Sequence, residues 1–344
     1  MRYSKAFVAC GTVLLLALAA RQHAIELYWT LRTYATFRAS LQRHPEILHR
    51  YNTSSHDTAA PHNSPELVPA ILHRIHLTEG RAISNYSEAI ASCHRLHPNW
   101  THLTWTDEAG AAFISQYYPA LWSHYINYPR RVQKANILRY AILEHYGGVY
   151  LDMDITCLQP LDDLRHLPFL APAAFPVGVS NGFMLSQAHH PLLKQVLNGV
   201  APSDLRWGLP YVETMLTTGC MFLSNQWTKY MSRLMGSEGT ADARDKIFVL
   251  ADEEGKVGPH ILRGAITTPL FRHGGASSWH EWDAAVGLFI ARHGWYFGMV
   301  VVTGLICTIV LVRRRSAFSS KIDKLTGKRS DASERGKYDA KSFV

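Results

Sequence analysis

Two carboxylates, Asp152 and Asp154, stand one residue apart directly after a short apolar run. Alternate side chains of an extended chain point to the same side, so the two carboxylates would share one face. Such a pair binds a hard divalent cation, Mg²⁺ or Mn²⁺, through oxygen ligands. An Asp-x-Asp triplet arises by chance about once in a chain of this length and average composition, so its meaning depends on its surroundings.

The residues before this pair predict a helix and then a strand. Apolar side chains recur at intervals of three and four residues and form one helical face: Val132, Ala135, Leu138, Ala141 and Ile142. Gly147 and Gly148 follow, where glycine turns the chain left-handed without a Cβ clash. Residues 149–151 are apolar and β-prone, as in a strand covered on both faces. The carboxylates then lie at the open end of an α/β sheet, where such sheets bind ligands.

The rest of the chain predicts one large α/β domain with short elements. We expect a first strand at Ala70–Ile75, a helix at Tyr86–Leu96 and a second strand at His102–Thr106. Helices at Ala109–Tyr118 and Leu121–Tyr128 lead to the central segment. From residue 186 to residue 271 we expect short helices and loops. The length allows a domain of about 200–250 residues beside membrane segments.

The charge of the chain sits at its two ends. The formal net charge is +8, but residues 313–344 hold ten Lys and Arg against four Asp and Glu, and Arg2 and Lys5 add two more positive charges. The body of the chain is therefore neutral. This distribution is typical of membrane topology and excludes the basic surface that nucleic-acid binding requires.

Two apolar segments are predicted to lie in a membrane. Ala6–Ala20 follows a basic start and is short for a span, so it is a cleaved signal peptide or a signal-anchor, of which we favour the anchor. Gly294–Val312 has no charge and is followed by three arginines, which favours a transmembrane helix. Both termini would then be cytosolic. We expect an N-terminal anchor segment at residues 1–34, a stem at 35–66, a luminal catalytic domain at 67–290, a transmembrane helix at 294–312 and a basic tail at 313–344.

Sequons and cysteines agree with a luminal body. Asn52, Asn85 and Asn99 each begin an Asn-x-Ser/Thr sequon. Cys93, Cys157 and Cys220 fall in the same part, so one disulfide and one free thiol are expected, with the pairing left open. No Cys/His spacing predicts a zinc site.

Several motifs resemble glycosyltransferase family 32, the "DXD sugar-binding" family that includes fungal Golgi mannosyltransferases. The layout is most similar to those that act on inositol phosphoceramide, and the resemblance covers roughly residues 67 to 283. It rests on these segments in order: Pro69–His76, His97–Asp107, Lys134–Tyr140, Tyr146–Asp154, Pro160-Leu161, Ser180–Met184, His190-Pro191, Thr217–Gly219 and His273–His280.

The resemblance implies a GT-A type, Rossmann-like nucleotide-sugar-binding fold and roles for single residues. Asp154 would bind Mn²⁺ or Mg²⁺, Asp152 the metal or the donor sugar, and His273 the metal or diphosphate. The donor would also meet side chains that precede the pair or lie near the end of the domain: Trp105, Asn136, Arg139, Tyr150, Ser277 and Trp279. Asn181 and His190 are candidates for the acceptor side. The family carries Asp where this chain has Asn136, which puts that residue's donor contact in doubt.

The implied function is that of a retaining glycosyltransferase that moves mannose from GDP-mannose to inositol phosphoceramide in the Golgi. We expect a front-side transfer, because no nucleophile signature accompanies the motifs. A membrane regulatory subunit is a plausible partner by the same resemblance. A glycan acceptor or a UDP-sugar donor remains open, because no motif fixes the base or the acceptor. An inactive membrane adaptor is a further alternative, against which the intact Asp152 and Asp154 argue.

Overall fold

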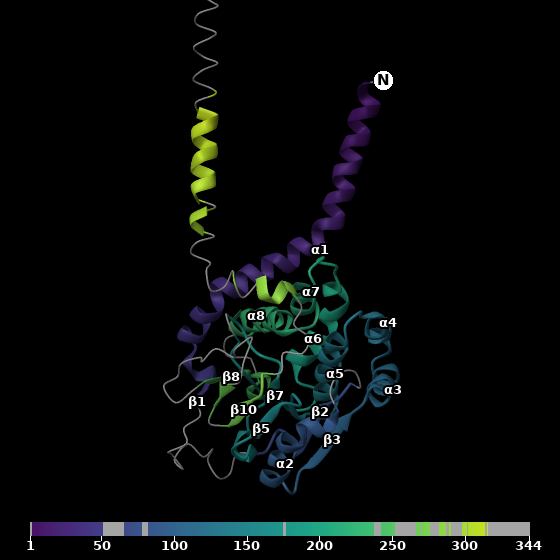
Figure 1. Cartoon of the computed structure of the whole chain (residues 1–344), viewed down its shortest axis with the longest axis vertical. Coiled ribbons are helices and arrows are strands. Elements are labelled where there is room, and N and C mark those ends of the chain that lie inside the picture. Colours follow the sequence, from purple (N-terminus) through teal and green to yellow (C-terminus); the bar gives the residue numbers. More distant parts are fainter. Residues whose placement is uncertain are drawn as a thin grey trace, which may run out of the picture. The chain divides into compact units, whose positions relative to one another are not determined.

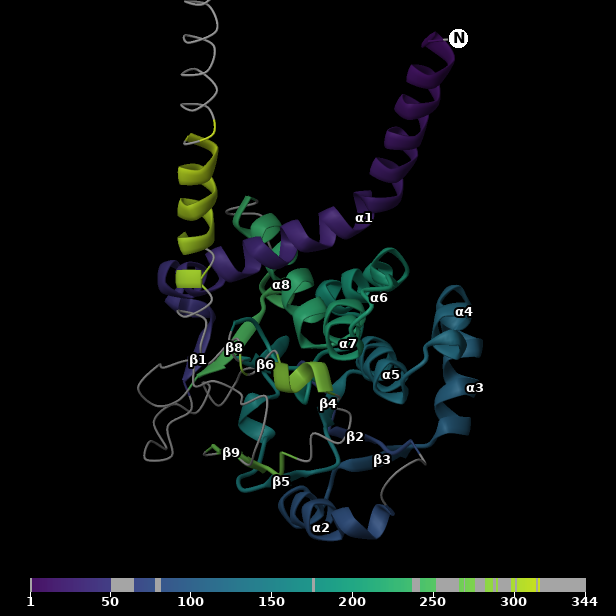
Figure 2. The ribbon, with the colours of Figure 1, turned by 45° about the horizontal axis from the view of Figure 1, so that its top comes forward.

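The strand that precedes the two carboxylates, β4 (Gly148–Leu151), lies inside a seven-stranded sheet (Figure 1; β4 is labelled in Figure 2). The strand order is β1-β8-β6-β7-β4-β2-β3. β7 runs antiparallel to both of its neighbours, and the other pairs are parallel. The remaining strands of this sheet are β1 (Leu48–Arg50), β2 (Ile71–Ile75), β3 (Thr101–Trp105), β6 (Phe169–Pro172), β7 (Phe183–Ser186) and β8 (Phe248–Ala251). The predicted α/β class is confirmed, and the sheet is largely parallel.

This computed structural model describes residues 2–50, 65–77, 82–174, 177–236, 242–251, 266–268, 270–275, 282–286, 289, 298–300, 302–313 and 315. Within residues 2–50, side chains are described from residue 20 to residue 49. The chain divides into two units, Met1–Asp283 and Ala284–Val344.

A small second sheet lies beside the end of β4. It contains β5 (Ile155–Cys157), β10 (Phe271–His273) and β9 (Ile266–Thr267), all antiparallel. β10 pairs with β5 so that His273 stands opposite Ile155. This pairing carries a histidine from late in the chain to the residue that follows Asp154.

Helices cover both faces of the large sheet. The helices α6 and α8 lie on one side and α2 on the other (Figure 2). The helices are α1 (Arg2–Arg43), α2 (Ser87–Leu96), α3 (Asp107–Tyr117), α4 (Pro119–Asn127), α5 (Arg131–Tyr146), α6 (Pro191–Ser203), α7 (Pro210–Thr217) and α8 (Cys220–Gly236). Proline occupies the first position of α4, α6 and α7, where its missing N–H costs nothing.

β4 is buried on both faces, as its sequence predicts. Tyr150 packs in the cluster formed with α5, α6 and α8, whereas Val149 and Leu151 pack in the cluster formed with α2. Each of the three side chains is at most 1% exposed. Burying a side chain of this size stabilises the fold by roughly 1.5–3 kcal/mol, so the strand is held firmly in place.

The two glycines between α5 and β4 are required by the backbone. Gly147 and Gly148 have φ angles of +67° and +100°. A Cβ on Gly148 would lie 2.6 Å from the carbonyl oxygen of Ile71 on the neighbouring strand. Glycine alone allows both the turn and the close approach of β2, so the predicted end of the helix is confirmed.

The N-terminal part differs from the predicted stem. α1 is one helix from Arg2 to Arg43, and its second half packs on α8. β1 (Leu48–Arg50) then adds an edge strand to the large sheet beside β8. Residues 35–50 of the predicted stem are therefore part of the folded domain, while residues 51–64 lie outside the described chain.

The second unit contains helical residues 298–300 and 302–313, which cover most of the predicted transmembrane segment 294–312. Among the residues whose side chains are described, no helix combines the length and the apolar character needed to cross a membrane. The two membrane segments stay predictions.

Candidate active site

The two carboxylates lie in a turn that follows β4, not on an extended strand. The N–H of Ile155 donates to the carbonyl oxygen of Asp152 at 3.1 Å, which closes the turn. The N–H of Asp152 donates to the carbonyl oxygen of Gly182 at 2.8 Å. The expectation of a shared face on an extended chain is therefore wrong in its geometry. The turn nevertheless brings both carboxylates to one side.

Asp152, Asp154 and His273 form a group that fits a divalent cation. One ligand atom of each residue lies within 4.8 Å of the ligand atoms of the other two. The Nε2 atom of His273 lies 3.5 Å from a carboxylate oxygen of Asp154. Two carboxylates with one imidazole form a donor set suited to Mn²⁺ and tolerable for Mg²⁺.

Gly274 allows the end of β10 to approach this group. Its N–H donates to the carbonyl oxygen of Asp154 at 2.9 Å. A Cβ at this position would lie 3.2 Å from both the Cβ and the carbonyl oxygen of Asp154. The missing side chain thus keeps His273 within reach of the carboxylates.

Arg139 and Tyr150 fix the position of the Asp152 carboxylate. Arg139 forms an ion pair with it at 3.2 Å, and the Tyr150 hydroxyl donates to the same oxygen at 2.7 Å. The Arg139 guanidinium also lies over the Tyr150 ring, 4.6 Å from its centroid. Complete burial alone would lower the pKa of Arg139, but the nearby Asp152 carboxylate and other neighbouring acidic groups together outweigh it, and the pKa is raised. The guanidinium of Arg139 therefore stays charged.

Asn181 connects this pair to α5 and α8. Its carbonyl oxygen accepts from Arg139 at 2.7 Å. Its side-chain amide donates to Asn136 at 3.1 Å and to the Tyr140 hydroxyl at 2.8 Å. The Cys220 thiol donates to its side-chain oxygen at 3.1 Å, and burial raises the pKa of that thiol. Three predicted site residues, Asn136, Arg139 and Asn181, thus share one buried network.

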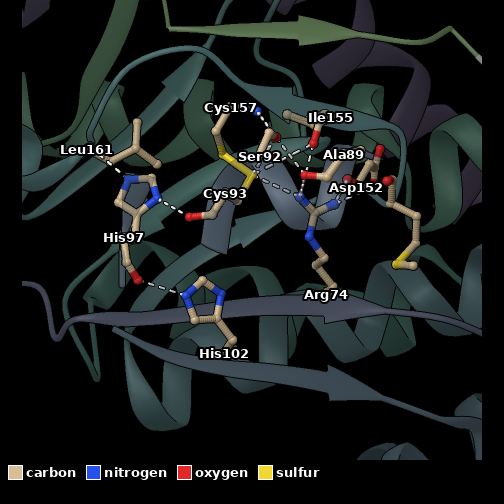
Figure 3. The surroundings of a disulfide bond; sticks show 11 residues. Arg74, Ala89, Ser92, Cys93, His97, His102, Asp152, Ile155, Cys157 and Leu161 are labelled. Atoms are coloured by element: carbon tan, nitrogen blue, oxygen red, sulfur yellow. Dashed lines mark hydrogen bonds between the residues drawn. A yellow bond between two sulfur atoms is a disulfide. The ribbon is translucent and has the colours of Figure 1, made fainter. Parts of the chain in front are cut away.

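Arg74 binds the backbone of the turn that carries the two carboxylates, and it was not predicted as a site residue. One guanidinium nitrogen donates to the carbonyl oxygens of Asp152 and Met153 at 2.8 and 3.1 Å (Figure 3). The other donates to the carbonyl oxygens of Ala89 and Ile155 at 3.3 and 3.0 Å. Burial lowers the pKa of Arg74 to about 10, so the side chain stays charged at neutral pH. A charged residue inside the apolar run of β2 was the signal for this role.

A disulfide joins α2 to β5 beside Arg74. It links Cys93 and Cys157, and the Sγ atom of Cys93 lies 3.0 Å from an Arg74 nitrogen (Figure 3). The N–H of Cys157 also donates to the Ser92 hydroxyl at 3.0 Å. The pairing left open by the sequence is therefore settled, and Cys220 is the free thiol of the three.

Known proteins identify the chain. Residues 84–169 match the model of the family described as "Glycosyltransferase sugar-binding region containing DXD motif". Inositol phosphoceramide mannosyltransferase 1 of Schizosaccharomyces pombe is 30% identical over 320 residues, which cover 90% of this chain and 92% of that protein. The chain belongs to the DXD-containing glycosyltransferase family.

Two further relatives of this glycosyltransferase extend the similarity. Inositol phosphoceramide mannosyltransferase 2 of Schizosaccharomyces pombe is 34% identical over 71% of this chain and 67% of its own length. A mannosyl phosphorylinositol ceramide synthase of Saccharomyces cerevisiae is 32% identical over 70% of this chain and 61% of its own length.

Two candidate residues of the glycosyltransferase, His190 and Trp105, use their ring N–H and ring nitrogen groups for contacts within the fold. His190 caps α6, accepting from the N–H of Leu192 at 3.1 Å and lying 3.2 Å from the carbonyl oxygen of Lys246. Trp105 donates its indole N–H to His73 at 3.3 Å and packs against the core. Neither has a described contact with the metal-binding group.

The other predicted residues divide between the surface and the parts not described. Asn85 and Asn99 are exposed, as glycosylation requires. Asn52, Ser277 and Trp279 lie outside the described residues, so their assigned roles stay predictions.

Proposed function

We propose that this glycosyltransferase transfers mannose from GDP-mannose to inositol phosphoceramide. The observation that carries the proposal is the Asp152, Asp154 and His273 group at the end of β4, in a chain whose relatives are named for this reaction. The mixed sheet, with ligand groups at the end of a parallel strand, supports a GT-A type nucleotide-sugar-binding fold.

A divalent cation, Mn²⁺ or Mg²⁺, held by these three residues would neutralise the diphosphate of the donor and make it a better leaving group. The protein side chains position this site. Arg139 and Tyr150 hold the Asp152 carboxylate, while Arg74 holds the backbone of the turn. The site is therefore preorganised before the donor binds.

We infer that the transfer retains the anomeric configuration through a front-side mechanism. A double displacement needs a carboxylate nucleophile about 5 Å from the acid, and here the paired carboxylates are committed to the metal-binding turn. The departing phosphate would then take the proton of the acceptor hydroxyl. Trapping a glycosyl–enzyme adduct with a slow donor analogue would refute this step.

We also propose a Golgi membrane location with a luminal catalytic domain and cytosolic termini. The Cys93–Cys157 disulfide fits an oxidising compartment, and the exposed Asn85 and Asn99 sequons fit the same side. The resemblance to the fungal sphingolipid mannosyltransferases also implies a membrane regulatory subunit as a partner. Nucleic acid is not a partner of this neutral domain.

The test is sugar transfer from a panel of nucleotide sugars to inositol phosphoceramide in microsomes that contain the full chain. We expect mannose transfer from GDP-mannose that EDTA abolishes and Mn²⁺ restores. Asp154→Ala should abolish transfer, whereas Asp163→Ala, which removes an exposed carboxylate elsewhere, should not. Metal-dependent hydrolysis of the donor without a lipid product would move the acceptor to a glycan. Transfer that is unaffected by EDTA and by Asp154→Ala would refute the proposal.

A further inference from the structure

Between residues 24 and 35, α1 presents apolar side chains to the outside and buries the polar side chains of Glu26 and Thr33 against the domain. Six exposed residues recur at intervals of three and four and form what we call the outer stripe: Ala24, Leu27, Tyr28, Leu31, Tyr34 and Ala35. Leu31 is 61% exposed and Tyr28 is 54% exposed. A surface helix of a soluble domain buries its apolar stripe, so this part of α1 has the reverse orientation.

Polar contacts on the inner side of α1 fix this orientation. Thr33 is fully buried, and its hydroxyl lies 3.0 Å from both Asn225 and Thr228 on α8. Glu26 accepts from the Ser203 hydroxyl at 3.1 Å. Farther along the helix, the rings of Phe37 and Trp227 meet edge to face at 4.9 Å. Rotating α1 to bury the outer stripe would break these hydrogen bonds and leave the partners on α8 without them, which costs free energy.

The charges around the outer stripe are positive. Arg21 and Arg38 are exposed at its two ends, and Arg32 lies at its side. The one acidic residue of this half, Glu26, faces the domain. Aromatic and apolar side chains between arginines are typical of helices that lie in the interface of an anionic bilayer.

We propose that the outer stripe of α1 lies in the headgroup region of a lipid bilayer and holds the domain against it. The same helix carries the apolar run Ala6–Ala20, so the stripe continues a segment that already favours lipid. A bilayer suits the stripe better than a protein partner does, because the residues of α1 that flank the stripe include arginines and no exposed carboxylate.

α8 connects this surface to the active site. Asn225 and Thr228 of α8 contact α1, and Cys220, at the start of the same helix, contacts Asn181 in the site network. Eight residues of helix span about 12 Å along the axis. A bilayer against the outer stripe would therefore lie on the side of the domain that α8 connects to the site network. The inference goes beyond the proposed reaction, because it rests on α1 and would hold for any acceptor.

The test is lipid photocrosslinking of the full chain in nanodiscs of phosphatidylcholine and phosphatidylserine. A phosphatidylcholine with a diazirine in its acyl chain is the probe, and adducts are mapped by mass spectrometry. We expect adducts on Leu27, Tyr28, Leu31 and Tyr34. Leu27→Glu with Leu31→Glu should remove them without changing Tm, whereas Gln42→Glu, an exposed position outside the stripe, should keep them.

Two outcomes would overturn the inference. One is adducts on the 6–20 segment without any on the outer stripe. The other is crosslinks from the stripe to a second copy of the chain in place of lipid. Neither outcome depends on turnover, so loss of the proposed reaction would be recognised separately by the transfer assay.

Discussion

Removing the Cys93–Cys157 disulfide should cost stability far more than it costs donor binding. The bond closes a loop with a sequence separation of 64 residues. Loop-closure entropy for that length corresponds to about 4 kcal/mol of stabilisation. For a domain of more than 200 residues, this free energy lowers Tm by about 8–16 °C. The change is Cys93→Ala with Cys157→Ala, and the measurement is thermal unfolding of the full chain with and without a reductant.

The contacts of Arg74 explain why donor binding should survive. Its bonds to the carbonyl oxygens of Asp152 and Met153 do not involve the disulfide, and the Ser92 hydroxyl still accepts from the N–H at position 157. Metal-dependent nucleotide affinity should therefore fall less than about tenfold, or 1.4 kcal/mol. Reduced wild-type protein should have the same Tm as the double variant. The Tm of the double variant should not change when the reductant is added. A Tm change under about 3 °C, or complete loss of nucleotide binding by folded double variant, would refute the reasoning.

The remaining predictions concern the turn that carries Asp152 and Asp154, and the buried His73. Arg74→Lys should weaken metal-dependent nucleotide binding by roughly tenfold or more in calorimetry, because lost bonds to buried carbonyls cost about 1–3 kcal/mol each; unchanged affinity would contradict its role. Gly182→Ala places a Cβ 2.9 Å from the Asp152 carboxylate and should lower Mn²⁺ affinity by about tenfold, whereas Gly236→Ala, with open space around it, should not. Burial lowers the pKa of His73 from 6.5 to about 4, so the unfolded chain binds an extra proton between these values. Stability should then be complete above pH 6.5 and fall by about 3 kcal/mol by pH 4, and His73→Gln should flatten this part of the Tm profile.

The sequence predicted the central part of the fold because its signals are local. The apolar period of α5, the two glycines after it and the apolar run of β4 lie within 21 residues. Each of them limits the backbone directly. β10 was missed because it is three residues long and contains one apolar side chain. Strands that short are defined by their partners.

The site shows the same division between local and distant information. Asp152 and Asp154 were found from their spacing, and Asn136, Asn181 and His273 from a family resemblance. No periodicity in the sequence places His273 beside Asp154, because that proximity depends on the pairing of β10 with β5. Arg74 was missed although a charge inside an apolar strand is a visible signal, since a buried charge needs partners that the sequence does not name.

α1 shows why a helical pattern alone does not decide which side of a helix is buried. Its second half carries an apolar stripe on one side and threonines with a glutamate on the other, which predicts the apolar side as the inner one. The structure buries Thr33 and Glu26 because α8 supplies partners for them at matching positions, namely Asn225, Thr228 and Lys229. The choice depends on those partners and on what covers the apolar side. When the polar side chains of a helix find hydrogen-bond partners inside the protein, its apolar side chains face outward and can contact lipid. This arrangement is expected of a domain that works on a membrane-embedded acceptor.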